Sequence, residues 1–139
     1  MYLLDTDTLI YCLKGVPEVV RGFESHAEDP MALSVVTYGE LIYGAMKSVR
    51  ATENLAKVRR VGEIYPLVDV TPAVMDTFGS LKADLERDGT RLDDFDLLIA
   101  STALMLGYAL VTNNERHFSR VPGLRVENWS KRRRDCGKE

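Results

Sequence analysis

Side chains that could bind a metal ion occur at four places in this sequence, each beside an apolar segment. They carry carboxylate or amide oxygens and are Asp5, Glu40, Asp96 and Asn114. Carboxylates that lie close together raise one another's pKa unless a cation intervenes. Oxygen atoms are the ligands that Mg²⁺ and Mn²⁺ prefer in proteins. If these side chains meet, the chemistry they favour is hydrolysis of a phosphodiester by a metal-activated water.

A zinc site is not indicated by the remaining ligand types. His26 and His117 have no partner at the spacing of a zinc site, and Cys12 and Cys136 are remote from each other in the sequence. Two cysteines also provide no disulfide framework, which favours a reducing compartment. Because neither a signal-peptide pattern nor an apolar run of membrane-spanning length occurs, we expect a cytoplasmic protein without a membrane partner.

Strand and helix patterns alternate along the chain. Strands are predicted at residues 2–4, 31–36, 67–70, 108–111 and 124–128. Helices are predicted at 9–13, from 17 onward, at 37–48, 51–62 and 71–89, and from the acidic cluster at 93–96 to residue 106. Strands separated by helices pair in parallel through right-handed crossovers. The sequence therefore predicts an α/β protein, a three-layer α/β/α sandwich around a mostly parallel five-stranded sheet.

Ligands of such sheets bind at the carboxyl ends of the strands. Asp5 directly follows the first predicted strand, and Asn114 follows the fourth. Glu40 lies in the first turn of the helix predicted after the second strand, and Asp96 in the first turn of the helix leading into the fourth. The four side chains are therefore expected to converge at one edge of the sheet.

The segment around Glu40 gives two more specific expectations. Residues 37–40 fit a capping box, in which Thr37 would open the helix and Glu40 would reach back to its first amides. Gly39 and Gly44 each cost a helix about 0.8–1 kcal/mol relative to alanine. We therefore expect another group to approach that turn closely.

Each acidic residue also has a purely structural interpretation. Asp7 could cap the first helix, Asp93 or Asp94 could cap the helix that contains Asp96, and Asn114 could belong to a turn. Independent capping, however, gives no reason for the acidic residues to gather at one edge. Their combined pattern favours a metal site.

Length and charge indicate one domain and a distinct C-terminal segment. The chain has 139 residues, 45% of them hydrophobic, which suffices for one core and not for two. Residues 1–129 are predicted to form that domain. Residues 130–139 carry five basic and two acidic side chains within a chain of net charge −3, and we expect this basic tail to be disordered.

Three segments resemble the PIN-domain ribonucleases of the VapC toxin type, from Met1 to about Trp129. They are MYLLDTDTLI, the residues from Glu40 to Ala45, and FDLLIASTALMLGYALVTNN followed by Phe118. The resemblance implies a PIN fold and Mg²⁺-dependent endoribonuclease activity, with Mn²⁺ as a substitute. It also implies inhibition by a VapB antitoxin whose C-terminal segment occupies a groove of the toxin. A homodimer is implied as well, assembled with the antitoxin into a heterotetramer or a larger complex.

By position, Asp5, Glu40 and Asp96 match the acidic triad of that family, with Asp5 and Asp96 as its magnesium ligands. Thr112 and Asn114 match the positions that complete the pocket. Many relatives carry aspartate at the place of Asn114, so a second metal would be held more weakly here.

The residues expected to support these groups are Thr6, Asp7, Asp94 and Thr112. Asp7 stands where asparagine is common in the family, and its charge could compensate for the amide of Asn114. An RNA substrate needs basic contacts to its phosphates. We assign these to Lys14, Lys47 and Arg116, and relatives of this type suggest tRNA as the substrate.

Three other interpretations remain open. A haloacid-dehalogenase-like phosphohydrolase would use Asp5 as its nucleophile, although Leu9 breaks its motif and the chain is short. A receiver domain would need an aspartate that ends the third strand, whereas Asp69 lies inside that pattern, and the only lysine near the fifth strand is Lys131. A catalytically inactive PIN fold could also act only as a binding module.

Overall fold

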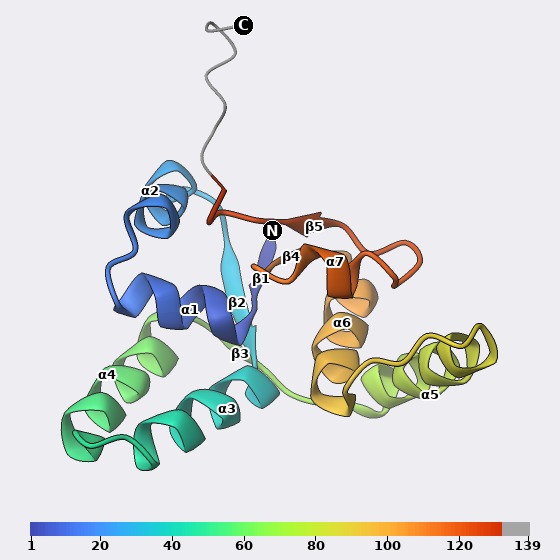
Figure 1. Cartoon of the computed structure of the whole chain (residues 1–139), viewed down its shortest axis with the longest axis horizontal. Helices are drawn as coiled ribbons and strands as arrows, with labels where there is room; N and C mark the ends of the chain where they lie inside the picture. The colour runs from blue at the N-terminus through green and yellow to red at the C-terminus, as the bar shows by residue number, and fades with distance from the viewer. Residues whose placement is uncertain (132–139) are drawn as a thin grey trace, which may run out of the picture.

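The computed structural model describes residues 1–131, and seven helices surround a five-stranded sheet within them (Figure 1). The strands are β1 (Tyr2–Leu4), β2 (Met31–Ser34), β3 (Leu67–Val68), β4 (Ala109–Val111) and β5 (Val126–Glu127). The helices are α1 (Thr6–Leu13), α2 (Pro17–Ser25), α3 (Val35–Met46), α4 (Ala51–Ile64), α5 (Pro72–Arg87), α6 (Asp94–Leu106) and α7 (Glu115–Phe118). Residues 132–139, most of the basic tail predicted at 130–139, lie outside the described part, and the domain boundary at residue 129 stays a prediction.

The strands are ordered β3-β2-β1-β4-β5, and every pairing between neighbours is parallel. β1 occupies the centre, where Leu3 pairs with Ala32 of β2 and with Leu110 of β4. All carboxyl ends therefore lie at one edge. The predicted α/β fold is confirmed, and the sheet is fully parallel.

Successive side chains of the central strands enter two separate hydrophobic clusters. Leu3 and Leu110 pack with buried residues of α5 and α6, whereas Leu4 and Val111 pack with buried residues of α1, α3 and α4. Because neighbouring side chains of a strand point to opposite faces of the sheet, these clusters are its two sides. Figure 1 shows the same arrangement, with α1–α4 on one side of the strands and α5 and α6 on the other. The three-layer sandwich is confirmed.

The start of α3 differs from the prediction. β2 ends at Ser34, and the Ser34 side chain accepts a hydrogen bond from the amide of Val36 at 3.1 Å, so the helix begins at Val35. The predicted capping box at Thr37 was therefore wrong. Thr37 is fully buried inside the helix, and Glu40 lies in its second turn. The carboxylate of Glu40 is thereby free of any capping role.

The start and end of α6 place acidic residues beside the sheet. Asp93 is the residue before its first turn, and Gly107 ends it with φ +69°, a left-handed conformation that favours glycine. The helix is buried from Leu97 to Ala103 except for one position. The burial of its centre fixes the position of Asp96 in its first turn.

Within residues 1–131, no helix is both long and apolar enough to cross a membrane.

The segment after β5 is packed tightly against α2. Trp129 is 7% exposed, and a Cβ atom added at Gly22 would lie 2.6 Å from the Trp129 Cβ. Carbon atoms cannot approach so closely without a shift of one of the two segments. Gly79 on α5 differs, because an added Cβ there would have no neighbour within 4 Å.

We predict that Gly22→Ala destabilises the protein by about 1–3 kcal/mol, the usual range for overpacking. Gly79→Ala, the matched control, should stabilise it by about 0.5–1 kcal/mol because alanine is the better helix former. Urea unfolding of the two variants measures both effects. Equal stability of the two variants would contradict the close contact between α2 and Trp129.

Candidate active site

The centre of the site lies where β1 and β4 end side by side. Asp5 follows β1 and Thr112 follows β4, and the Thr112 hydroxyl donates a hydrogen bond to Asp5 Oδ2 at 2.7 Å. The amide of Thr6 donates to Asp5 Oδ1 at 2.8 Å. Both oxygens of this carboxylate therefore have a fixed partner, and each keeps a free lone pair.

Asp5 is 4% exposed, and its burial raises its pKa to about 6. The hydrogen bonds from Thr112 and Thr6 lower this pKa, and the nearby charges of Asp7 and Asp96 raise it. Burial dominates because an ionised carboxylate loses its hydration. Asp5 is thus a buried acid that resists ionisation.

Glu40 reaches the same place from α3. The Thr6 hydroxyl donates a hydrogen bond to Glu40 Oε1 at 2.8 Å, which joins α1 to α3. Partial burial raises the pKa of Glu40, and Asp96, Asp7 and Asp93 raise it further. The charge of Asp96 acts on both Asp5 and Glu40.

Asp96 has a partner that its sequence neighbourhood does not indicate. Its Oδ2 lies 3.0 Å from Nε2 of His117, a residue 21 positions later on α7. Burial raises the pKa of Asp96, His117 lowers it, and the negative charges of Asp93 and Asp7 raise it. The histidine holds one oxygen of Asp96, and the other remains available.

Asn114 closes the group on the side of β4. Its side-chain amide donates to Asp7 Oδ2 at 3.0 Å, and its backbone amide donates to the Thr112 hydroxyl at 3.1 Å. Asn114 therefore contacts Asp7 directly and Asp5 only through Thr112.

Asp94 does not join the predicted group of supporting residues. Its carboxylate is 58% exposed and forms an ion pair of 2.9 Å with Lys82 on α5. Its neighbour Asp93 is the residue whose charge acts on Glu40 and Asp96.

No group of residues 1–131 makes the close approach expected at Gly39 and Gly44, and an approach by a bound molecule stays a prediction. A Cβ atom added at either glycine would have no neighbour within 4 Å. Gly44 instead borders an open hollow of about 350 Å³ between α1, α3 and α4, which Glu40 and Lys14 also line. Lys14, one of the predicted RNA contacts, thus lies on the side of the site formed by α3. Lys47, another of them, lies with its ammonium 5.0 Å from the ring centre of Tyr43.

The donor set fits a hard divalent cation with few protein ligands. Within residues 1–131, no three or more Asp, Glu, His or Cys side chains are already arranged around one point as metal ligands. Magnesium sites commonly use one or two carboxylates and complete their coordination with water and substrate phosphate. Asp5 and Asp96 could supply the two carboxylates, because the charge of Asp96 raises the pKa of Asp5 and a cation beside both would relieve that repulsion.

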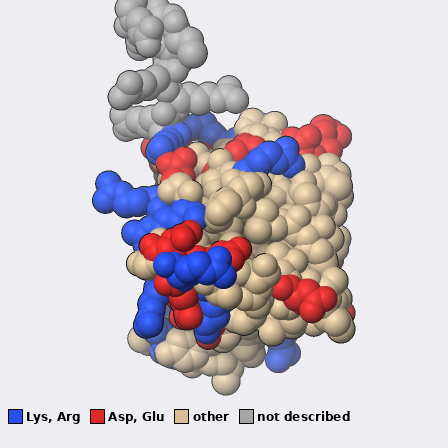
Figure 2. Space-filling model, turned by 90° about the vertical axis from the view of Figure 1, so that its right-hand side faces the viewer, with Lys and Arg blue, Asp and Glu red and all other residues tan. Residues whose placement is uncertain are grey.

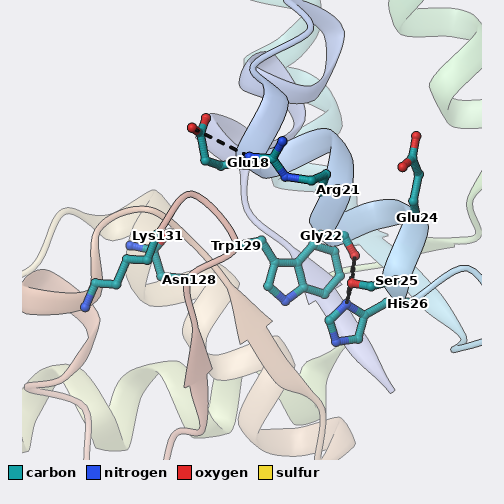
Figure 3. A pocket seen from close by; sticks show the side chains of 9 residues that line it. All are labelled: Glu18, Arg21, Gly22, Glu24, Ser25, His26, Asn128, Trp129 and Lys131. Atoms are coloured by element: carbon teal, nitrogen blue, oxygen red, sulfur yellow. Dashed lines mark hydrogen bonds and ion pairs between the residues drawn. The ribbon is translucent and has the colours of Figure 1, made fainter. Parts of the chain in front are cut away.

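Another hollow, of about 520 Å³, lies away from these carboxylates, between α2 and the segment after β5 (Figure 3). His26 stacks on Trp129 there, with ring centres 4.4 Å apart, and its Nδ1 lies 2.8 Å from the Gly22 carbonyl oxygen. Both rings are engaged in packing. This hollow holds none of the acidic residues described above.

Comparisons with known proteins agree with the fold. A family model described as "PIN domain" matches residues 2–124. The "tRNA(fMet)-specific endonuclease VapC" of Salmonella typhimurium is 40% identical over 129 residues, covering 92% of this chain and 97% of that protein. "Ribonuclease VapC2" of Haemophilus influenzae is 38% identical over 129 residues, with coverage of 92% and 97%.

The crystal structure of DNA-bound VapBC from Salmonella typhimurium superposes with a TM-score of 0.85 at 36% identity, covering 92% of this chain and 97% of that one. The chain therefore belongs to the PIN-domain family, and within it to the VapC group.

We predict that Asp5→Asn stabilises the metal-free protein at pH 7.5. The ordinary pKa of aspartate, 3.8, is raised to about 6 in the folded state, so the folded protein binds this proton more tightly than the unfolded chain. Above pH 6 the buried charge therefore costs about 3 kcal/mol, and this cost falls as the pH drops from 6 toward 4.

Urea unfolding with a chelator, at several pH values between 5 and 8, measures the difference between the variant and the wild type. Asp76→Asn is the control, because Asp76 is exposed on α5 and loses no buried charge. If the gain in unfolding free energy of Asp5→Asn over the wild type does not shrink as the pH falls, the raised pKa of Asp5 is contradicted.

Proposed function

We propose that this protein is a metal-dependent endoribonuclease that acts as the toxin of a toxin–antitoxin pair. The observation that carries the proposal is the link from Asp5 through Thr6 to Glu40 at the carboxyl edge of the sheet. The charge of Asp96 also raises the pKa of both carboxyl groups. The names of the VapC relatives support ribonuclease activity. The Salmonella relative is named a tRNA(fMet)-specific endonuclease, so we propose tRNA as the substrate class and the cytoplasm as the location of the reaction.

In this proposal Asp5 and Asp96 would hold Mg²⁺ or Mn²⁺ through their carboxylate oxygens. When bound, such a cation lowers the pKa of a water molecule and stabilises charge on the phosphate oxygens. Thr112 and Thr6 hold the Asp5 carboxylate in one orientation, and His117 does the same for Asp96.

Glu40 is the residue that we assign to take a proton from the attacking water. The Thr6 hydroxyl occupies its Oε1, which leaves Oε2 for that proton. Burial and the neighbouring acids raise the pKa of Glu40, which makes it a stronger base than an ordinary glutamate. Asn114 keeps Asp7 in place beside this group.

The phosphohydrolase alternative is less well supported. A nucleophilic aspartate must reach a phosphorus atom with one unhindered oxygen, whereas Asp5 is 4% exposed and both of its oxygens accept hydrogen bonds. An inactive PIN fold that only binds partners is distinguished from our proposal by the cleavage assay below.

We propose a VapB-type antitoxin as the protein partner, since the similar solved structures include VapBC complexes. The hollow between α1, α3 and α4 is a suitable seat for the C-terminal segment of an antitoxin. Its lining includes the apolar side chains of Ile10, Leu13, Leu41 and Val58, and Leu13 is 42% exposed. The homodimer implied by the family resemblance is part of the proposal, and it would assemble with the antitoxin as a heterotetramer or larger.

We predict that the purified protein cleaves RNA internally when Mg²⁺ or Mn²⁺ is present, and that Asp5→Asn or Asp96→Asn reduces the rate at least about 100-fold. Each substitution removes a charge that the metal requires, at a cost of about 3 kcal/mol or more in the barrier. Glu40→Gln should also cause a severe loss of the cleavage rate. Asn114→Ala should cause only a partial loss, because Asn114 contacts Asp5 only through Thr112. Gel analysis of labelled RNA measures these rates.

Asp76→Asn is again the matched control. Asp76 lines a hollow together with Leu104 near the end of α6, remote from Asp96 in its first turn, and its substitution should leave cleavage unchanged. Retained cleavage in both the Asp5 and Asp96 variants would refute the assignment of the site.

We further predict that expression of the wild-type chain alone arrests bacterial growth, whereas Asp5→Asn does not, because toxicity requires cleavage. Co-expression of its cognate VapB-type antitoxin should restore growth. Viable counts after induction measure the effect. Equal toxicity of the wild type and the Asp5→Asn variant at matched protein levels would show that toxicity has another origin.

A further inference from the structure

A polar hollow of about 390 Å³ lies against the side of the acidic site formed by α7. We call it the α7 hollow, and the residues of its lining that matter here are Asn114, Arg116, His117, Arg120, Asn128 and Lys131. They come from α7, from the residues just after it and from the segment after β5. Three of these side chains are strong cations.

The two arginines of this hollow differ from most others on the surface. Arg21, Arg50, Arg60 and Arg87 each form an ion pair with an acidic residue three positions away. Figure 2 shows such interleaving of basic and acidic side chains on one face of the molecule. Among residues 1–131, the side chains of Arg116 and Arg120 have neither an ion pair nor a hydrogen bond.

Lys131 is the third cation, and it pairs with Glu115, the acidic side chain of this lining. The hollow therefore carries three positive charges against one negative charge, if His117 is counted as neutral. An unpaired arginine presents a planar set of donors that matches two phosphate oxygens. The charge and the donors of the hollow suit a phosphodiester backbone.

The hollow is also contiguous with the acidic group, because two residues belong to both. His117 contacts Asp96 at 3.0 Å, and Asn114 contacts Asp7 at 3.0 Å. A nucleic-acid strand with its scissile phosphate at Asp5 and Asp96 that continues toward α7 would pass over these two side chains. The next phosphates along the strand would then reach Arg116 and Arg120.

We propose that the α7 hollow is a phosphate subsite for the nucleotides adjacent to the scissile bond, with Arg116 and Arg120 as the direct contacts. The inference rests on the proposed ribonuclease function and adds to it the side of the active site on which the strand is held. Lys131 contributes charge, reduced by its ion pair with Glu115. The neighbouring hollow of Figure 3 shares Asn128 and Lys131.

The test is binding of a fluorescently labelled single-stranded RNA to the full chain carrying Asp5→Asn, which removes cleavage, over a series of salt concentrations. Arg116→Gln with Arg120→Gln should weaken binding at least about tenfold. The slope of log affinity against log salt should fall by about 1.4, because each lost phosphate contact to a single strand contributes about 0.7. Glu115→Gln should tighten binding, since it frees Lys131.

Two matched controls separate a subsite from a general effect of charge. Arg60→Gln removes a positive charge from α4, which packs on the opposite face of the sheet from α6, and Asp76→Asn removes a negative charge from α5. Neither should change the slope. Three outcomes would each overturn the subsite. They are an equal loss of RNA affinity in Arg60→Gln and in the double variant, an unchanged salt slope in the double variant, and no RNA binding by the parent protein.

Cleavage by the wild-type chain is measured in parallel, so that the two proposals can fail separately. If the wild type cleaves RNA and the arginine variants bind normally, the subsite is wrong and the ribonuclease assignment stands. If RNA binding depends on the two arginines and no cleavage occurs, the ribonuclease assignment is wrong, and the α7 hollow binds RNA phosphates without serving a scissile bond.

Discussion

The hydrogen bond from the Thr112 hydroxyl to Asp5 joins the ends of β1 and β4 and holds a nearly buried carboxylate in place. A carboxylate in such surroundings is costly unless its oxygens have partners. Thr112 and the Thr6 amide supply them. The Thr6 amide is the next one along the chain, whereas Thr112 is available only because β1 and β4 are parallel neighbours that end at the same edge. The remaining polar contacts of the site extend from this point.

Those contacts form a chain that links separate layers of the molecule. Thr6 follows Asp5 and binds Glu40 on α3, which covers one face of the sheet. Thr112 binds the backbone of Asn114, which in turn binds Asp7 on α1. His117 on α7 holds Asp96 at the start of α6, which covers the other face. Acidic groups from both helical layers are thus fixed around one edge.

The electrostatics of this edge oppose the stability of the free protein. Burial and mutual repulsion raise the pKa of Asp5, Glu40 and Asp96, and His117 is the basic side chain that offsets part of this for Asp96. The hydrophobic clusters on both faces of the sheet must offset that unfavourable energy. Proteins commonly retain such unfavourable arrangements at functional sites. A divalent cation would convert the repulsion into binding energy.

Local patterns in the sequence determined the alternation of strands and helices, and with it the edge at which Asp5, Glu40, Asp96 and Asn114 gather. This was possible because parallel strands separated by helices leave few topologies open. The same patterns misplaced the start of α3, since Ser34 and Thr37 are both good caps and only the end of β2 decides between them.

Side-chain direction was decided by the tertiary structure. Asp93 and Asp94 are adjacent and chemically identical, yet Lys82 on α5 draws one of them away from the site. His117 reaches Asp96 because α7 folds back over the start of α6, a contact between residues 21 positions apart that no local spacing encodes. Sequence patterns report the neighbours of a residue along the chain, whereas its contacts across the chain depend on how the layers pack.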